Sequence, residues 1–353
     1  MNIAVIDVAA ESGGALSVLN DFCDELRKFE TKDHWYIVTS VVKIEETEYL
    51  YNIRIPSIKR SWFHRIFWEK FCFSKLMREQ KIDVVVSLQN NALPKGNWKQ
   101  VVYFHNVLLL KHNISFSFFK GEERPFFIYS KILGPYIRRT WKNADKMYVQ
   151  TENIKRLVGE SGFRGDVEVV LPDANIKGKI EYARKKIRGY IYPVAAISYK
   201  NHMAIIRAVE KINKDKIRTE ILFTIDGSEN KYANQIVERS KKVPGIQCVG
   251  KMSRDKLFQC YSNYGVVMAS KIESFGMPLL EAKMFQTVIV ALDYPYAREL
   301  LSDYNRAYLT TEDKLGEAIL NGMKDMQQGN YVNNKRTGWE KMICSVKEVR
   351  KNR

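Results

Sequence analysis

Short apolar runs rich in β-branched residues alternate with longer amphipathic segments along this chain, and that alternation constrains its fold more than any other feature. The first series of runs occupies residues 3–8, 35–40, 84–88, 101–106, 146–151 and 167–172. The second series occupies residues 189–195, 221–227, 246–250, 265–270 and 288–293. Continuous apolar strands separated by helices are typical of parallel sheets that helices cover on both faces. The two series therefore predict two Rossmann-like α/β domains.

The length of the chain agrees with two domains. Its 353 residues are too many for one ordinary core and suit two domains, each of roughly 150 residues. We place the join in segment 172–189, because it is polar and highly charged, as linkers between domains usually are. The predicted domains are residues 1–175 and 176–337.

The composition indicates a globular protein with an anionic partner. Hydrophobic residues make up 45% of the chain and charged residues 27%, and the formal net charge is +17. A basic excess suits nucleic acid, anionic lipid or a phosphorylated substrate. No zinc finger or RNP-like string supports nucleic acid, so we do not expect a nucleic-acid partner.

The cysteine and histidine patterns predict no metal site. The five cysteines are scattered without a CxxC pair, and the five histidines show no HxxxH spacing. We expect free thiols in a reducing compartment and no protein-bound metal. No secretory signal is recognised, and no uncharged apolar run approaches the roughly 20 residues that span a bilayer. The expected location is the cytoplasm or a membrane surface.

Residues 271–285, KIESFGMPLLEAKMF, place Glu273 and Glu281 on either side of a Gly-Met-Pro turn. The segment follows a predicted strand, and its proline favours the start of a helix. Backbone amides of Phe275, Gly276 and Met277 at that start can point at an anion, while carboxylates accept hydrogen bonds from sugar hydroxyls. The pattern suits a ligand with phosphate and hydroxyl groups. Because a glutamate in a first turn also stabilises a helix, Glu281 could instead be only a dipole partner.

The sequence ESFGMPLLEA resembles the E-x7-E signature of retaining glycosyltransferases of family 4, and the preceding VGKMSRDKLFQCYSNYGVVMAS is similar to the family's run before that signature. The resemblance implies the GT-B fold, in which two Rossmann-like domains face each other across a cleft. It also implies an acceptor-side first domain, a donor-binding second domain, and a last helix over 338–353 that packs back on the first. Within the signature it implies that Glu273 contacts the donor sugar during catalysis and that Glu281 binds the ribose. The residues that it implies for the diphosphate are Ser274, Phe275, Gly276 and Met277.

Residues 192–203 resemble the family's donor-phosphate loop. The resemblance implies that Lys200 and Asn201 bind the donor, and an ammonium beside a leaving diphosphate stabilises its developing charge. The family's arginine is missing, because Val194 stands six residues before Lys200. Lys200 therefore acts alone or with a basic group from elsewhere, unless it is only an exposed lysine at a helix start.

Two features of the first predicted domain also resemble the family. The loop VAAESGGALSVL resembles the family's first loop, which implies that Gly13 and Gly14 let the backbone approach the donor. His105 ends the predicted strand VVYFHN, where many members have a catalytic histidine near the reacting sugar. A plain strand-to-helix connection at the glycines and a structural histidine are the alternatives.

Residues 57–81 combine aromatic and basic residues at helical spacing. Phe63, Phe67 and Phe71 recur every four positions, with lysines and arginines among them. Such a helix suits an anionic membrane surface, although the same phenylalanines could face a core. A second aromatic and basic region over 115–141 favours the membrane. Since both regions lie in the acceptor-side domain, we expect a lipid-linked glycan acceptor.

The resemblance implies a retaining, metal-independent transfer of a hexosyl group from a nucleoside diphosphate sugar to an acceptor hydroxyl, with no cofactor. We expect a role in bacterial surface polysaccharide synthesis (capsule, lipopolysaccharide O-antigen or exopolysaccharide), peripherally on the inner face of the cell membrane. The alternative is a catalytically inactive GT-B subunit that scaffolds a glycosyltransferase complex or binds a partner. The nucleotide base, donor sugar, acceptor, linkage and oligomeric state stay open.

Overall fold

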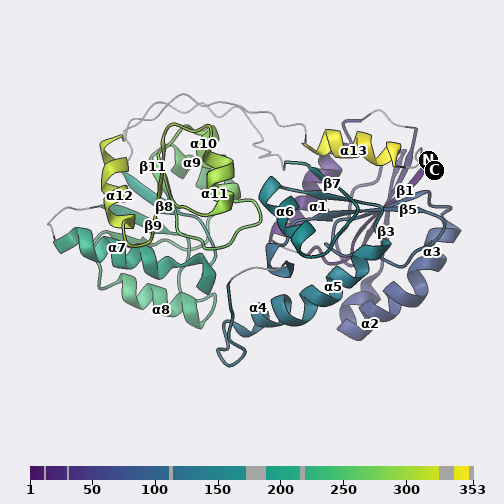
Figure 1. The fold of residues 1–353 in the computed structure, drawn as a ribbon, viewed down its shortest axis with the longest axis horizontal. Helices are drawn as coiled ribbons and strands as arrows, with labels where there is room; N and C mark the ends of the chain where they lie inside the picture. Colours follow the sequence, from purple (N-terminus) through teal and green to yellow (C-terminus); the bar gives the residue numbers. More distant parts are fainter. Residues whose placement is uncertain are drawn as a thin grey trace. The chain divides into compact units, whose positions relative to one another are not determined.

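The structure is a computed structural model that describes residues 1–11, 13–29, 32–110, 114–171, 188–214, 219–325 and 338–349. The chain divides into two compact units, each built around its own sheet (Figure 1). The first unit comprises Met1–Ser115, Phe126–Asn175 and Arg336–Arg353, and the second comprises Phe116–Pro125 and Ile176–Lys335. Most of the predicted join at 172–189 lies outside the described residues.

The sheet of the first unit has seven strands in the order β3-β2-β1-β4-β5-β6-β7, and every neighbouring pair is parallel. Its strands are β1 (Asn2–Asp7), β2 (His34–Thr39), β3 (Leu50–Arg54), β4 (Val84–Ser87), β5 (Lys99–Phe104), β6 (Lys146–Val149) and β7 (Asp166–Val169). In register, Asn2 of β1 stands opposite His34 of β2, and Ile3 stands opposite Val84 of β4.

The helices of the first unit connect and cover these strands. The α-helices are α1 (Gly13–Leu26), α2 (Trp62–Phe67), α3 (Phe73–Glu79), α4 (Arg124–Ile128, which begins in the second unit), α5 (Gly134–Thr140), α6 (Glu152–Glu160) and α13 (Gly338–Glu348). Between them lie the 3-10 segments η1 (Pro56–Arg60), η3 (Val107–Leu109) and η5 (Trp141–Asn143) and the π-helical segments η2 (Trp68–Cys72) and η4 (Tyr129–Leu133).

Alternation along β1 sends successive side chains to two cores, because neighbouring residues of a strand point to opposite faces. Ile3 and Val5 belong to the core that α1 and α13 cover, and Ala4 and Ile6 belong to the core that η2 and α3 cover. Trp339 of α13 is 2% exposed, and its ring centroid lies 4.7 Å from that of Tyr103 on β5. The last described helix is therefore part of the core of the first unit.

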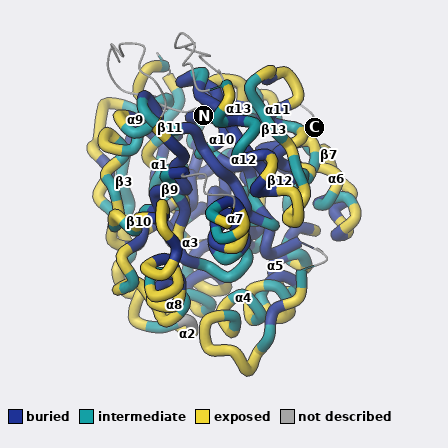
Figure 2. Tube along the Cα trace, turned by 90° about the vertical axis from the view of Figure 1, so that its left-hand side faces the viewer, coloured by how far each residue is buried: buried dark blue, intermediate teal, exposed yellow. Residues whose placement is uncertain are grey.

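The second unit has six parallel strands in the order β10-β9-β8-β11-β12-β13. They are β8 (Gly189–Tyr192), β9 (Glu220–Phe223), β10 (Ile246–Cys248), β11 (Tyr264–Met268), β12 (Ile289–Leu292) and β13 (Ala307–Thr310). The helices are η6 (Ser198–Lys200, 3-10), α7 (His202–Lys214), α8 (Lys231–Ser240), α9 (Arg254–Tyr261), α10 (Met277–Met284), α11 (Pro295–Leu301) and α12 (Leu315–Lys324). Figure 2 shows central strands such as β12 as buried and helices such as α8 as largely exposed.

The prediction of two Rossmann-like domains with parallel sheets is confirmed, but two strands were missed. These are β3 and β13, each at an edge of its sheet. Their burial patterns are mostly intermediate or exposed, because an edge strand is covered less completely than a central one. A search for continuous apolar runs did not find them, although it found β7 and β10 at the other two edges. Among the described residues, no helix is both long and apolar enough to cross a membrane.

Candidate active site

The candidate residues of the second unit meet where its strand order reverses. The order turns between β8 and β11, which are neighbours in the sheet, and ligands of open parallel sheets bind beyond the carboxyl ends of the strands at such a point. The loop after β8 carries Lys200 and the loop after β11 carries Glu273. A main-chain hydrogen bond of 2.9 Å from the Lys271 amide to the Tyr199 carbonyl joins the two loops.

Lys200 and Glu273, which are far apart in sequence, form an ion pair. The Lys200 Nζ lies 2.5 Å from the Glu273 Oε1, and the two side chains are 14% and 13% exposed. The ammonium also stands 5.3 Å from the centroid of the Tyr199 ring, and the hydroxyl of Tyr192 donates to the Lys200 carbonyl. Lys200 is thus mostly buried and held by its neighbours, unlike an exposed lysine at a helix start.

Asn201 closes the Lys200 loop in a left-handed conformation. Its φ is 60° and its ψ is 38°, a region that asparagine tolerates better than most residues. Its side-chain amide donates to the Oε2 of Glu312 at 3.0 Å, and the same carboxylate binds Arg207 at 2.5 Å and Lys271 at 3.5 Å. Glu312 therefore ties the loop after β8 to the segment after β13.

The turn that follows Glu273 and Ser274 sets up the start of α10. Gly276 has a φ of 95°, and a Cβ there would lie 3.3 Å from the ring of Tyr296, so glycine suits this position twice over. The helix begins at Met277 and Pro278 is its second residue. Within the described part of the chain, the amides of Phe275, Gly276 and Met277 donate to no backbone carbonyl. These amides can therefore serve as donors to an anion.

Glu281 stands one turn into α10 and is 6% exposed. Its Oε2 accepts from the hydroxyl of Tyr261 at 2.9 Å, and its Oε1 accepts from Arg254 at 3.4 Å. Burial raises the pKa of this carboxyl above its ordinary value, and the charge of Arg254 opposes that shift. Each oxygen keeps a second lone pair, so the ionised group can accept hydrogen bonds from two neighbouring hydroxyls.

Gly13, Gly14 and His105 belong to the first unit, whose strand order reverses between β1 and β4. Gly13 begins α1, the helix that follows β1. Apart from its chain neighbours and the backbone of its own helix, an added Cβ at Gly14 would meet no atom within 4 Å, so packing does not require a glycine there. A glycine would be required at this position if a ligand approached the backbone closely.

His105 follows β5 and is bound to the loop after β4. Its amide donates to the Asn90 Oδ1 at 2.8 Å, and its Nε2 lies 2.8 Å from the Leu88 carbonyl oxygen. The Asn90 Nδ2 also lies 3.3 Å from Nε2, but the contact with the Leu88 carbonyl is shorter and a carbonyl only accepts, so we assign the ring proton to Nε2, which makes Nδ1 a hydrogen-bond acceptor. Burial lowers the pKa of His105, so the neutral ring is favoured.

Several residues of this arrangement were missed in the sequence. Arg254 and Tyr261 hold Glu281, Tyr296 packs over Gly276, and Glu312 holds Asn201. Arg254 and Tyr261 lie on α9, inside the run before the signature that resembles the family, but no role was assigned to them; Tyr296 lies on α11 and Glu312 after β13, outside the motifs quoted. Val194, where the resemblance leads us to expect an arginine, is buried at 9% exposure. Arg254 is the basic residue that the structure adds beside Glu281.

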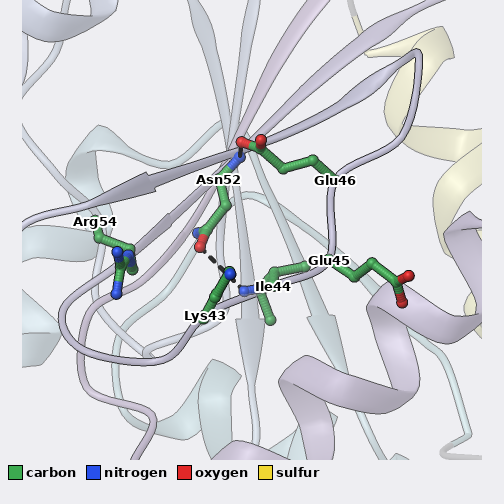
Figure 3. Close-up of a pocket in the computed structure, with 6 residues that line it drawn as sticks. All are labelled: Lys43, Ile44, Glu45, Glu46, Asn52 and Arg54. Carbon is green, nitrogen blue, oxygen red and sulfur yellow. Dashed lines mark hydrogen bonds between the residues drawn. The ribbon is translucent and has the colours of Figure 1, made fainter.

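A surface pocket of about 600 Å³ lies elsewhere, beside β3 (Figure 3). It is lined by Lys43, Ile44, Glu45, Glu46, Asn52 and Arg54. The Asn52 amide donates to the Glu46 Oε1 at 2.8 Å, and the Asn52 Oδ1 accepts from the Ile44 amide at 3.0 Å. No predicted site residue lines this pocket. Across the described residues, no cluster of three or more His, Cys, Asp or Glu side chains could hold a metal ion.

Residues 179–339 match the family model of glycosyl transferases group 1. The matched segment contains Lys200, Glu273 and Glu281. Solved structures extend the likeness over both units. Sucrose-phosphate synthase from Thermosynechococcus elongatus is 14% identical, with a TM-score of 0.69 over 99% of this chain and 93% of that one. WaaG, a glycosyltransferase involved in lipopolysaccharide biosynthesis, is 12% identical, with a TM-score of 0.64 over 98% and 99%.

HepE from Anabaena, solved in complex with UDP and glucose, is 13% identical, with a TM-score of 0.60 over 99% of this chain and 97% of that one. No curated protein matches the sequence. The chain has the GT-B fold. At these identities the likeness to solved structures concerns the fold alone, and the GT-B fold agrees with the two parallel-sheet units described above.

Proposed function

We propose that this protein is a retaining, metal-independent glycosyltransferase that moves a hexosyl group from a nucleoside diphosphate sugar. One observation carries the proposal: the Lys200–Glu273 ion pair stands where the second sheet reverses its order, beside a helix start with available amides and a buried Glu281. A cation, a row of amides and two carboxylates suit a ligand that has a diphosphate and two sets of hydroxyls.

In the proposed complex each part of the donor has its own partner. Glu281 accepts from the ribose hydroxyls, and Glu273 accepts from hydroxyls of the transferred sugar. The diphosphate binds the amides of Phe275, Gly276 and Met277, and there it competes with Glu273 for the Lys200 ammonium. The matching family and the UDP and glucose in the HepE structure support this class of donor.

Arg254 is our proposed second cation for the diphosphate, in place of the family's missing arginine. Its side chain is 38% exposed, and its contact with Glu281 is long at 3.4 Å. A guanidinium has five N–H donors in a planar fork, so Arg254 can bind Glu281 and a phosphate oxygen together. In this role Arg254 would replace the arginine that the donor-phosphate loop lacks.

The proposed transfer is a substitution on one face of the sugar. The bond from the anomeric carbon to the phosphate oxygen breaks, the bond to the acceptor oxygen forms on the same face, and the acceptor's proton passes to the departing phosphate. Lys200 and the helix start stabilise the charge that grows on the phosphate. The neutral His105, with Nδ1 as acceptor, would receive a hydrogen bond from a hydroxyl of the reacting sugar. No metal takes part, since these groups supply the positive charge.

For the acceptor we propose a lipid-linked glycan in bacterial surface polysaccharide synthesis, and for the location the inner face of the cell membrane. WaaG, with the same fold, is involved in lipopolysaccharide biosynthesis. The net charge of +17 favours an anionic surface. An inactive GT-B scaffold remains the second candidate because Val194 replaces an arginine, and it predicts donor binding without transfer.

Thermal unfolding in a panel of nucleotide sugars tests the donor site. We expect one nucleotide series to raise the melting temperature through binding to the native state, and Glu281→Gln to weaken that shift. Glu238→Gln, at an exposed pair on α8 with Lys241, is the matched control and should leave the shift unchanged. If no nucleotide or nucleotide sugar stabilises the wild-type protein, the enzyme proposal is wrong. With the donor identified, NMR of the product would show whether the anomeric configuration is retained.

A further inference from the structure

Three phenylalanines of the first unit form an exposed stripe along one helical segment. Phe63, Phe67 and Phe71 are 77%, 59% and 67% exposed, and the ring centroids of Phe67 and Phe71 lie 5.1 Å apart. The other reading of the sequence, in which these residues face a core, is thereby excluded. Large aromatic side chains that are gathered in one exposed patch usually mark an interaction site.

A π-helical turn allows one segment to have both a buried face and this exposed stripe. Trp68, Phe73 and Met77 are buried hydrophobic residues of this segment, and Trp68 and Phe73 are five positions apart. In a regular α-helix five residues rotate by about 500°, which would leave Phe73 about 140° away from Trp68. The wider turn of η2 returns both side chains to the core, while Phe67 and Phe71 stay outside. Such turns are frequent at functional sites.

A second exposed stripe lies on the chain around η4 and α5. Tyr129, Ile132 and Tyr136 are 41%, 60% and 38% exposed, and η4 is again π-helical. Burial raises the pKa of Tyr136, and the charges of Glu69 (which raises it) and Arg65 (which lowers it) also act on this pKa, so Tyr136 lies near the segment that carries the first stripe. The two stripes therefore belong to one region of the first unit.

The charges along both stripes are mostly positive. Residues 56–78 hold six lysines and arginines and one acid, Glu69, which is 8% exposed and bound to Arg65 at 3.0 Å. Residues 126–142 hold four lysines and arginines and no acid. Arg60, Lys70 and Lys131 are exposed among the aromatic residues. The region combines apolar anchors with cations and offers no exposed acid within these two stretches.

We propose that this aromatic-basic surface, made by Phe63, Phe67, Phe71, Tyr129, Ile132 and Tyr136 with their neighbouring cations, binds the interface of an anionic lipid bilayer. The inference rests on the proposed function, and it names the surface by which the enzyme reaches a lipid-linked acceptor. Aromatic rings insert at the boundary between head groups and acyl chains, and lysine and arginine bind anionic head groups. A second copy of the chain is disfavoured as occupant, because a two-fold interface would bring the same basic surface against itself.

Co-sedimentation with vesicles of phosphatidylcholine and about one-third phosphatidylglycerol tests the surface. We expect wild-type protein to bind these vesicles, and to bind more weakly without the anionic lipid or at high salt. Phe63→Ser/Phe67→Ser/Phe71→Ser should reduce binding by more than about tenfold, and Arg60→Glu/Lys70→Glu should reduce it on anionic vesicles alone. Matched controls are Val41→Ser/Leu309→Ser, which removes exposed apolar side chains elsewhere, and Lys155→Glu/Lys211→Glu, which makes the same charge change elsewhere.

The inference is overturned if the wild-type protein does not bind the vesicles. It is also overturned if the triple phenylalanine variant binds them as strongly as wild type does. It is also overturned if the wild-type protein is a dimer and the same three substitutions make it a monomer, because the surface then binds a second copy. The thermal shift with donor separates this inference from the proposed function. If a variant no longer binds vesicles but still shows the donor-induced rise in melting temperature, the result concerns the membrane surface alone. If the wild-type protein shows no such rise, the result contradicts the proposed enzyme function.

Discussion

The carboxylate of Glu281 is buried, accepts hydrogen bonds from two protein donors and is our proposed contact for the ribose. Its raised pKa means that it gains a proton at a higher pH than an ordinary glutamate. Only the ionised group accepts hydrogen bonds on both oxygens, and protonation turns one of them into a donor. Donor affinity should therefore fall as the pH is lowered through the pKa of Glu281.

Tyr261→Phe should move this loss of affinity to higher pH. The tyrosine hydroxyl stabilises the ionised carboxylate, so its removal raises the pKa of Glu281 further. Titration calorimetry of the nucleoside diphosphate across pH measures the midpoint. Tyr304→Phe removes another buried hydroxyl of the same unit, bound to the Thr287 carbonyl at 2.6 Å, and should leave the midpoint in place. Equal midpoints for wild type and Tyr261→Phe would contradict the proposed coupling.

Asp7 is a second buried carboxyl, at the end of β1. It is 1% exposed, and burial raises its pKa from 3.8 to about 7. The folded state then keeps a proton that the unfolded state has already lost, so the free energy of unfolding should fall as the pH rises from about 4 to about 7.

Asp7→Asn removes this titration, and asparagine can still accept from the Ala10 amide as Asp7 does. At pH 8 we expect the variant's first unit to be more stable than wild type by about 2 to 4 kcal/mol. Denaturant unfolding at pH 4 and pH 8 measures the difference. A gain of the same size at both pH values would show that titration of Asp7 is not its cause.

At the scale of elements, the start of α10 depends on the conformation of Gly276. Gly276→Ala places a Cβ in the left-handed region and against the ring of Tyr296. We expect a loss of about 1 to 2 kcal/mol in stability and weaker donor binding, because the amides that precede the helix must shift. Stability comes from denaturant unfolding and affinity from calorimetry. Unchanged values in both would contradict the account of this turn.

Gly14→Ala is the matched substitution at the start of the other candidate helix. Its Cβ meets no atom within 4 Å outside its chain neighbours and its own helix backbone, so stability should stay within about 0.5 kcal/mol of wild type. Transfer activity should nevertheless fall, since a methyl group would occupy space that we assign to the donor. A fully active variant would leave the glycine pair as a plain strand-to-helix connection.

At the scale of the molecule, helix α13, which lies late in the sequence, packs into the core of the first unit. The Trp339 ring packs against Phe22 at 5.6 Å and Tyr103 at 4.7 Å between ring centroids. Tyr148 on β6 donates to Ser345 at 2.6 Å. A substitution in this helix should therefore lower the stability of strands near the start of the chain.

Trp339→Ala should destabilise the first unit by about 3 to 5 kcal/mol through the cavity that it leaves. Hydrogen exchange should quicken in β1, β4 and β5, and peptides from β8 to β13 should keep their protection. Phe119→Ala, at a residue that is 91% exposed, is the control and should change neither set. Equal loss of protection in both units would show that they unfold together.

Prediction from the sequence succeeded where burial leaves a local pattern. Central strands such as β1 and β11 are apolar on both faces, so their runs are continuous and easily recognised. The edge strands β3 and β13 lack that signal and were missed. The spacing of Phe63, Phe67 and Phe71 predicts a common helical face but not its surroundings, because a core and a membrane both favour aromatic residues.

The sequence by itself determined the two parallel α/β series and the turn between Glu273 and Glu281, because strand burial, glycine and proline act over a few neighbouring residues. Only the tertiary structure decided that Lys200 pairs with Glu273, that Tyr261 and Arg254 hold Glu281, and that the phenylalanine stripe is exposed. These outcomes depend on which strands become neighbours and on how a helix is rotated against its sheet. Both are set by packing between segments far apart in the chain, which no local pattern records.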